Sequence, residues 1–463
     1  MRAIVLVLLL AACSPRDIVG SAPFPSDLSD PAATKTPEGA LAAYHGTLVR
    51  FRIAVGDRFS GYVPVSGLLT DELRDRNQLG LAYAATPGPD VRDFPDPATS
   101  GPDVTLYSYL QKVRGQGYQA VGLLRDFAPE TSPALRGHLY AVMGYAETML
   151  AELYCSGIPL STLDYDGDYT LAPGSSTAEV LTHAQALFDT ALTLAGDSAR
   201  ILNLARVGRA RALLALGDYA GAAAAVADVP TTFQYAVTYA IASPGETQGV
   251  NFGYRLLPFS WEYSMSDQEG VNGLPYRSSN DPRTLSTPGG TNDNGATIYQ
   301  SAKYASDGLS PIVLADGIEA RLIEAEAELN GAAGGDWLAT LNALRTDGTF
   351  DTQPSDTNPA VTDTLWHAGT GGVAGLAPLA DPGTPNARVD LVFRERAFWL
   401  FLTGHRQGDL RRLIRQYGRN ASQVYPIGPY NLGTSYGTDI TAPIPESERT
   451  NNPLFTGCQS RGA

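Results

Sequence analysis

The stretch Arg388–Arg415, RVDLVFRERAFWLFLTGHRQGDLRRLIR, predicts two helices that meet at a break. Apolar residues recur at helical spacing in its first half. Gly404 can adopt the left-handed conformation that ends a helix, and a second amphipathic segment follows. Because arginine and carboxylate groups form planar two-point contacts, we expect the charged residues around the break to form a structural ion-pair network rather than a catalytic site. These residues are Glu395, Arg396, Arg406, Asp409 and Arg412.

Helical periodicity extends over much of the remaining chain. Thr36 followed by Pro37 predicts the start of a long helix, because Thr caps helix N-termini and Pro suits the first turn. Two later regions each predict a helix pair of the tetratricopeptide type, with small residues where the helices cross. Such repeats bury their apolar faces only by stacking. We therefore expect a mainly α fold in which three or four tetratricopeptide-like helix pairs form a curved scaffold. The two pairs are Leu202–Leu216 with Ala220–Val229 and Gly317–Leu329 with Trp337–Arg345.

Two long segments lack any sustained period and predict an irregular, loop-rich lobe. Residues 231–307 are rich in Tyr, Gly, Asn, Ser and Pro, whereas residues 346–386 are poorer in aromatic residues. Long irregular segments inside a domain are commonly functional or disordered. The aromatic content of the first segment argues against disorder.

The aromatic residues of segment 231–307 are the best candidates for ligand contacts. The apolar faces of sugar rings stack on Trp and Tyr, while a few polar groups bind the hydroxyls. We expect Trp261 and Tyr263 to contribute first, then Tyr276 and Tyr254. The alternative is that these rings only pack the lobe together, which is the commoner role at any single position.

The charged C-terminal stretch resembles a known family. The residues Glu395-Arg396, Gly404-His405-Arg406 and Asp409-Leu410-Arg411-Arg412 resemble the C-terminal signature of SusD/RagB-type nutrient-binding lipoproteins. The later Pro443-Ile444-Pro445-Glu446 and Asn451-Asn452-Pro453 resemble the ending of the same family. The resemblance implies a SusD-like α-α superhelix with no catalytic residues.

The resemblance also implies how the chain is divided. One SusD-like domain is expected over residues 36–463, with insertions on the ligand side. Its helical scaffold is expected at 36–230 and 308–345, its irregular insertions at 231–307 and 346–386, and its signature region at 388–463.

The N-terminus predicts export and lipidation. A short apolar run precedes Leu10-Ala11-Ala12-Cys13, which resembles a bacterial lipobox. We expect residues 1–12 to be a lipoprotein signal peptide, Cys13 to carry the lipid (palmitate included), and residues 13–35 to be a flexible tether. An ordinary signal peptide or a misassigned start is the alternative. The resemblance implies the outer membrane, at the cell surface, as the location.

Composition and motif searches exclude several functions. The net charge of −15 argues against a nucleic-acid partner, which needs a basic surface. The five histidines show no metal-ligand spacing, and no nucleotide-binding motif is present, so no cofactor or metal is expected. Asp164–Asp168 is acidic but lacks the EF-hand pattern, which leaves a solvated loop or an irregular calcium site.

Cys155 and Cys458 can form a disulfide in an exported chain, but the sequence does not show that they lie close together.

The family resemblance implies a non-enzymatic function. A cell-surface lipoprotein of this kind captures a nutrient, usually a glycan and sometimes a peptide, and delivers it to a SusC-like TonB-dependent transporter. Two alternatives remain open at this stage. One is a tetratricopeptide-type scaffold that binds another protein, and the other is an extracytoplasmic glycoside hydrolase.

Overall fold

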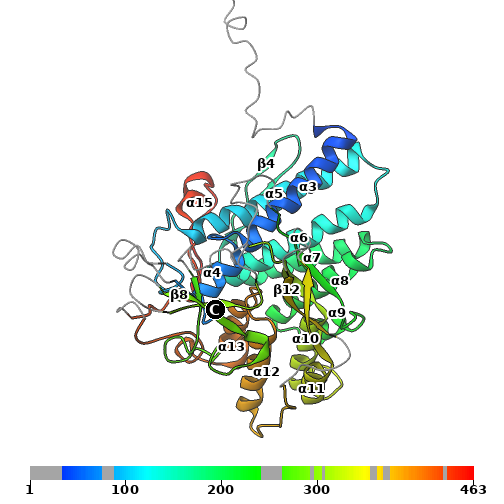
Figure 1. The fold of residues 1–463 in the computed structure, drawn as a ribbon. Coiled ribbons are helices and arrows are strands. Elements are labelled where there is room, and N and C mark those ends of the chain that lie inside the picture. Colours follow the sequence, from blue (N-terminus) through cyan, green and yellow to red (C-terminus); the bar gives the residue numbers. More distant parts are fainter. Residues whose placement is uncertain are drawn as a thin grey trace, which may run out of the picture.

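The fold is mainly helical, as the sequence predicts. The computed structural model describes residues 34–75, 88–240, 263–291, 297–304, 308–354, 362–368, 376–430 and 435–463. Helices α3 to α11 follow one another in a curved array, from blue to yellow in Figure 1, with α12 and α13 at its far end. Each helix packs against the next one or two along the chain, which is the arrangement expected of stacked helix pairs.

The helices have the following bounds. They are α3 (Pro37–Gly56), α4 (Tyr62–Leu69), α5 (Pro102–Phe127), α6 (Pro133–Leu153), α7 (Thr177–Leu194), α8 (Ala199–Leu216), α9 (Tyr219–Val226), α10 (Gly317–Leu329), α11 (Trp337–Asp347), α12 (Pro385–Trp399), α13 (Arg406–Tyr417), α14 (Ala421–Val424) and α15 (Glu446–Asn451). The two predicted tetratricopeptide-like pairs correspond to α8 with α9 and α10 with α11.

Local capping signals begin and end several helices where the sequence places them. The Thr36 side chain accepts a hydrogen bond from the backbone N–H of Gly39 and so caps α3. Gly404 has φ +79° in the break between α12 and α13, and Gly418 ends α13 in the left-handed conformation. The predicted break in the C-terminal stretch is therefore present.

Helix α4 is not marked by any amphipathic period in the sequence. Every residue of Tyr62–Leu69 is buried, so the segment is apolar on all sides. It contacts α3, β1 and α13, which places it at the junction between the first helices and the C-terminal region. A helix of this kind is specified by its surroundings rather than by a one-sided pattern.

Short antiparallel strand pairs occur both in the segments expected to be irregular and within the expected helical scaffold. Sequence shows no alternation there because each strand is only two to seven residues long and several are rich in Gly, Ser and Thr. The pairs are β1 (Leu73–Asp75) with β7 (Tyr263–Met265), β2 (Ile158–Pro159) with β5 (Gly174–Ser175), β3 (Thr162–Leu163) with β4 (Tyr169–Thr170), β6 (Gln234–Val237) with β10 (Ile312–Asp316), β8 (Ser286–Thr291) with β9 (Thr297–Ser301), and β11 (Gly348–Pro354) with β12 (Thr362–Ala368).

The glycine at the helix break provides a test of this geometry. A Cβ at Gly404 would lie 2.8 Å from the ring of Tyr62, which is fully buried. Gly404→Ala should therefore lower the free energy of unfolding by more than the roughly 1 kcal/mol that a left-handed alanine costs. Gly418→Ala is the matched control, because φ is +64° there and nothing lies within 4 Å of the added Cβ. Urea unfolding of both variants measures the difference, and equal losses would contradict the close packing of Tyr62.

Candidate functional site

The charged residues at the helix break form a buried ion-pair network. Arg396 of α12 donates to Asp409 of α13 over 2.8 Å, and Arg412 donates to the same carboxylate over 2.8 Å. Arg412 also pairs with Glu326 of α10. All four side chains are at most 4% exposed. The network thus joins three helices, which is a structural role.

The other signature residues connect the break to distant segments. Arg406 donates to both oxygens of Asp71, at 2.7 and 3.0 Å. Glu395 accepts from Arg283 over 2.7 Å and from Arg345 over 2.8 Å. These buried pairs hold residues on the C-terminal helices against the start of the chain and against the insertion.

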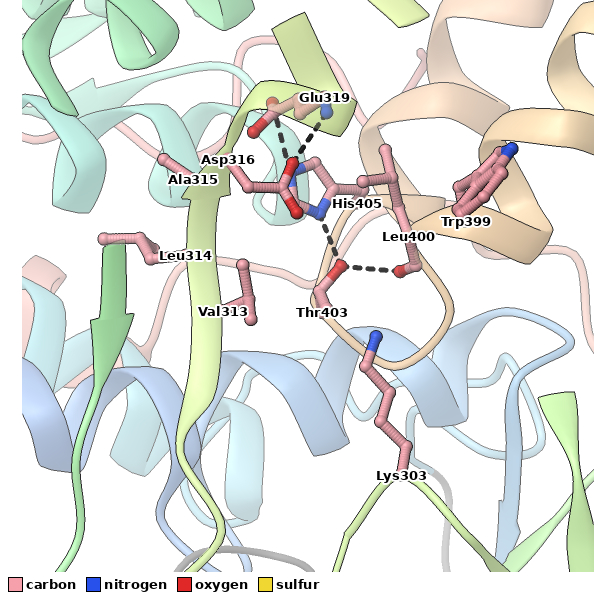
Figure 2. Close-up of a pocket in the computed structure, with 10 residues that line it drawn as sticks. All are labelled: Lys303, Val313, Leu314, Ala315, Asp316, Glu319, Trp399, Leu400, Thr403 and His405. Carbon is pink, nitrogen blue, oxygen red and sulfur yellow. Dashed lines mark hydrogen bonds and ion pairs between the residues drawn. The ribbon is translucent and has the colours of Figure 1, made fainter. Parts of the chain in front are cut away.

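A small polar cavity lies beside the break, with its lining shown in Figure 2. Lys303 donates to the carbonyl of Phe401 over 2.8 Å, and the Nε2 atom of His405 lies 3.1 Å from Glu319 Oε1. Asp316 caps α10 by accepting from the N–H of Glu319. The cavity has a volume of about 10 Å³. That is room for one water at most, so this cluster does not hold a nutrient.

The structure places two of the four predicted aromatic contacts inside the core. Tyr276 is 0% exposed, and its ring centroid lies 4.6 Å from that of Phe401. Tyr263 is 5% exposed and lies on β7. Neither ring has a face open to a ligand here. Tyr263 and Tyr276 therefore have the alternative role, in which the rings pack the lobe together. Trp261 and Tyr254 lie outside the described residues.

The best candidate for a binding site is an open groove along α5, which we call the α5 groove. Its volume is about 680 Å³, within the usual range for ligand sites. Three segments line it besides α5: the end of α3 at Arg50, the β-rich segment 159–171, and α15 with the following Asn452. The lining stretch of α5 runs from Val104 to Gln119, about 22 Å at 1.5 Å per residue. The groove is therefore long enough for a chain of several sugar rings.

The groove combines an open aromatic face with many polar groups. Tyr169, on β4, is 60% exposed and lines the groove. Amide and hydroxyl side chains on α5 and α15 line the same groove, at Ser108, Gln116 and Asn451 among others. An exposed ring beside amides is suited to the two faces of a sugar, one apolar and one hydroxylated.

Hydrogen bonds fix the walls of the groove relative to one another. Gln111 of α5 donates to the carbonyl of Pro159 over 3.0 Å and to the hydroxyl of Tyr107 over 3.1 Å. Tyr107 in turn donates to Glu448 of α15 over 3.2 Å, and burial raises the pKa of this phenol. Asn452 donates to the carbonyl of Ala172 over 2.9 Å. The site is thus largely preorganised before any ligand arrives.

A disulfide between Cys155 and Cys458 secures the C-terminal wall. The Cα atoms are 5.8 Å apart across a sequence separation of 303 residues. Cys155 follows α6, and Cys458 follows α15, so the bond ties the end of the chain to the base of the 159–171 segment. The sequence left this pairing open, and the structure shows it.

Sequence reasoning did not find the α5 groove, because its residues come from four separate segments. One signal was available: Ser108, Lys112 and Gln116 recur every four residues on α5 and form a polar stripe beside its apolar face.

The acidic loop at Asp164 is held by hydrogen bonds within the loop, because the Asp164 carboxylate accepts from the backbone N–H groups of Asp166 and Asp168. In the described part of the chain, no cluster of three or more His, Cys, Asp and Glu side chains is suited to a metal ion.

Comparison with solved structures identifies the fold. A SusD-like carbohydrate-binding protein from Bacteroides vulgatus aligns over 91% of this chain and 97% of its own, with 14% identity and a TM-score of 0.58. A SusD superfamily protein from Parabacteroides distasonis aligns over 91% and 98%, with 15% identity and a TM-score of 0.64. Surface glycan-binding protein A from Bacteroides thetaiotaomicron aligns over 92% and 99%, with 12% identity and a TM-score of 0.61.

The chain has the SusD-like fold. No family model matches the chain, and no curated protein matches it in sequence. The SusD resemblance of the C-terminal stretch is therefore confirmed at the level of the fold, over nearly the whole chain. Within the described residues, none of the helices is both apolar enough and long enough to span a bilayer.

The cavity in Figure 2 predicts a pH-dependent contribution to stability. Burial, with the nearby Glu319 carboxylate, raises the pKa of Asp316 to about 7. The folded state therefore holds the proton more tightly than the unfolded chain, and this stabilisation is present below about pH 4 and lost as the pH rises towards 7. Asp316→Asn keeps the capping oxygen but cannot ionise, so it should raise the urea midpoint more at pH 8 than at pH 4.

The control for this prediction is Asp218→Asn at the solvent-exposed N-cap of α9, where Asp218 accepts from Gly221 over 2.9 Å. It removes the same charge from an exposed cap, so the comparison between the two variants isolates the effect of burial at position 316. A gain from Asp316→Asn that is equal at pH 4 and pH 8 would show that the carboxyl at 316 does not titrate in this range.

Proposed function

We propose that this protein is a lipid-anchored, cell-surface lipoprotein that captures a glycan in the α5 groove and delivers it to a SusC-like TonB-dependent transporter. The observation that carries the proposal is the groove itself, where the exposed ring of Tyr169 lies among amide and hydroxyl side chains. The SusD-like fold supports it, since a similar structure is described as a carbohydrate-binding protein and another as a surface glycan-binding protein. A peptide is the alternative ligand for the same capture function.

Capture requires no catalysis by this chain, because the transporter partner would supply the driving force for import. The described lining of the groove contains one carboxylate, Glu448, which is already held by Tyr107 and Asn452. Cleavage of a glycosidic bond by the usual mechanisms needs two carboxyl groups that flank the bond. The groove therefore favours binding over hydrolysis.

A protein-binding scaffold is the second candidate function. The burial of Tyr263 and Tyr276 favours it, because two rings proposed as ligand contacts are core residues. Stacked helix pairs also present extended surfaces that suit protein partners. The two candidates differ in the ligand that they predict: a glycan or peptide for capture, and a protein partner for the scaffold. The next experiment distinguishes them.

Filling the groove should weaken glycan binding strongly and leave the fold intact. Gly115 lies on α5 in the lining, and nothing lies within 4 Å of a Cβ added there. Gly115→Leu should reduce binding at least tenfold in a glycan and peptide screen on the soluble form that begins at Ser14. Gly115→Ala is the matched control, because alanine and leucine have similar helix propensity but alanine fills far less of the groove.

Both Gly115 variants should match or exceed the parent in thermal stability, since glycine costs about 0.5–1 kcal/mol in a helix. Binding that survives Gly115→Leu would remove the α5 groove as the site. A parent protein that binds no glycan or peptide, but captures a protein partner, would favour the scaffold function.

Lipidation has its own test. Cys13→Ala should move the protein from the membrane fraction to the soluble fraction, because the lipid on Cys13 is the proposed anchor. Immunoblots of fractionated cells measure the change, with Ser21→Ala in the proposed tether as the control that leaves both the lipid site and the disulfide intact. A Cys13→Ala variant that stays in the membrane fraction would rule out this anchor.

A further inference from the structure

The electrostatic character of the α5 groove differs from that of the whole chain. The chain carries a net charge of −15. The groove lining holds two cationic side chains, Arg50 and Lys112, and one carboxylate, Glu448. The lining therefore has an excess of one positive charge in a strongly acidic protein. Local charge of the opposite sign to the rest of a surface concentrates ligands that carry the complementary charge.

The single carboxylate is occupied by neutral partners. Glu448 accepts from the hydroxyl of Tyr107 and from the amide of Asn452, at 3.2 and 3.1 Å. These bonds hold it against the wall, and no ion pair joins it to a cation among the described residues. Glu448 therefore does not pair with either cation of the groove.

The two cations are without acidic partners in the described part of the chain. Neither Arg50 nor Lys112 takes part in the ion pairs found there, although most buried arginines do. The Nε atom of Arg50 is shielded from solvent and has no hydrogen-bond partner among the described residues. Asp57, on the same side of the molecule, is already engaged by the N–H groups of Phe59 and Ser60. Both cations therefore lack an acidic partner among the described residues, and their charge remains to attract an anionic ligand.

We infer that the α5 groove takes an anionic glycan, whose carboxylate or sulfate groups bind Arg50 and Lys112 while a ring stacks on Tyr169. This inference rests on the proposed function. A guanidinium offers planar two-point hydrogen bonding to carboxylate and sulfate oxygens, and an ammonium supplies a compact positive charge. Lys112 lies one helical turn from both Ser108 and Gln116. The sugar hydroxyls next to the anionic group can therefore hydrogen-bond to these two neutral side chains.

The test compares ligands that share a sugar backbone and differ in whether they carry an anionic group. Oligogalacturonate and its methyl ester share one sugar backbone, and so do sulfated dextran and dextran. The parent protein should bind the charged member of at least one pair at least tenfold more tightly, and that binding should weaken as salt rises. The pair that shows the difference tells carboxylate from sulfate. Equal affinity for charged and neutral members would overturn the inference.

Variants then locate the charge effect. Arg50→Gln and Lys112→Gln should each weaken binding of the anionic ligand about tenfold and weaken binding of the matching neutral glycan much less. Arg394→Gln is the matched control, because it removes the same charge from an exposed site on α12, remote from α5 in Figure 1. Loss of affinity that is equal in all three variants would show a long-range effect of net charge and would overturn the assignment of contacts.

The outcomes separate this inference from the proposed function. Charged and neutral glycans that bind with equal affinity, and whose binding is blocked by Gly115→Leu, would leave the capture function standing and overturn the anionic preference. Absence of binding to every glycan, charged or neutral, would overturn the capture function and the inference together.

Discussion

The carboxylate of Asp409 joins two helices through two buried arginines, Arg396 and Arg412. A buried charge is tolerated only when its partners are complete, and loss of one partner typically costs about 3–5 kcal/mol. Glu326 completes the network from α10 and so fixes the last helix pair of the scaffold against α12 and α13. The pairs made by Arg406 and Glu395 then extend this fixed point to Asp71 and to the insertion. The orientation of the C-terminal region relative to the scaffold depends on these contacts.

Charge is used differently inside the molecule and in the α5 groove. In the interior, arginines face carboxylates at hydrogen-bond distance, and their binding capacity is consumed by the fold. In the groove, the carboxylate is held by neutral groups and the cations are left open. This contrast separates the structural network from the proposed recognition surface more sharply than residue type does, because both contain arginine and glutamate.

The helical scaffold could be predicted from sequence because its signals are local. Amphipathic periods, the Thr36 cap and the left-handed glycines each act within a few residues, and they place the helix pairs and the break correctly. Helix α4 and the short strands were missed for the opposite reason. The α4 segment is buried on every side, and strands such as β1 and β7 become regular only by pairing with distant partners. Their conformation is a product of tertiary contacts.

The candidate site was harder to predict, because aromatic content alone does not distinguish a ligand platform from a core. Tyr276 packs on Phe401 and Phe398, whereas the exposed Tyr169 lies in an acidic, loop-rich stretch whose sequence does not distinguish it as an aromatic site. What distinguishes them is exposure, which depends on the neighbours each ring acquires in the fold. The same holds for Lys112, an ordinary surface lysine in sequence that lines the same groove as α15 in the folded chain.

The C-terminal wall of the groove links the site to the compartment in which the chain folds. Helix α15 has six residues and no buried side chain, so it has little stability of its own. Its position depends on Asn452, on the bonds around Ser156 and Gln459, and on the disulfide that closes 303 residues of chain. Such bonds persist in oxidising compartments and are rare in the cytosol. An oxidising compartment therefore favours the closed C-terminal wall of the groove, and the export proposed from residues 1–12 would place the chain in one.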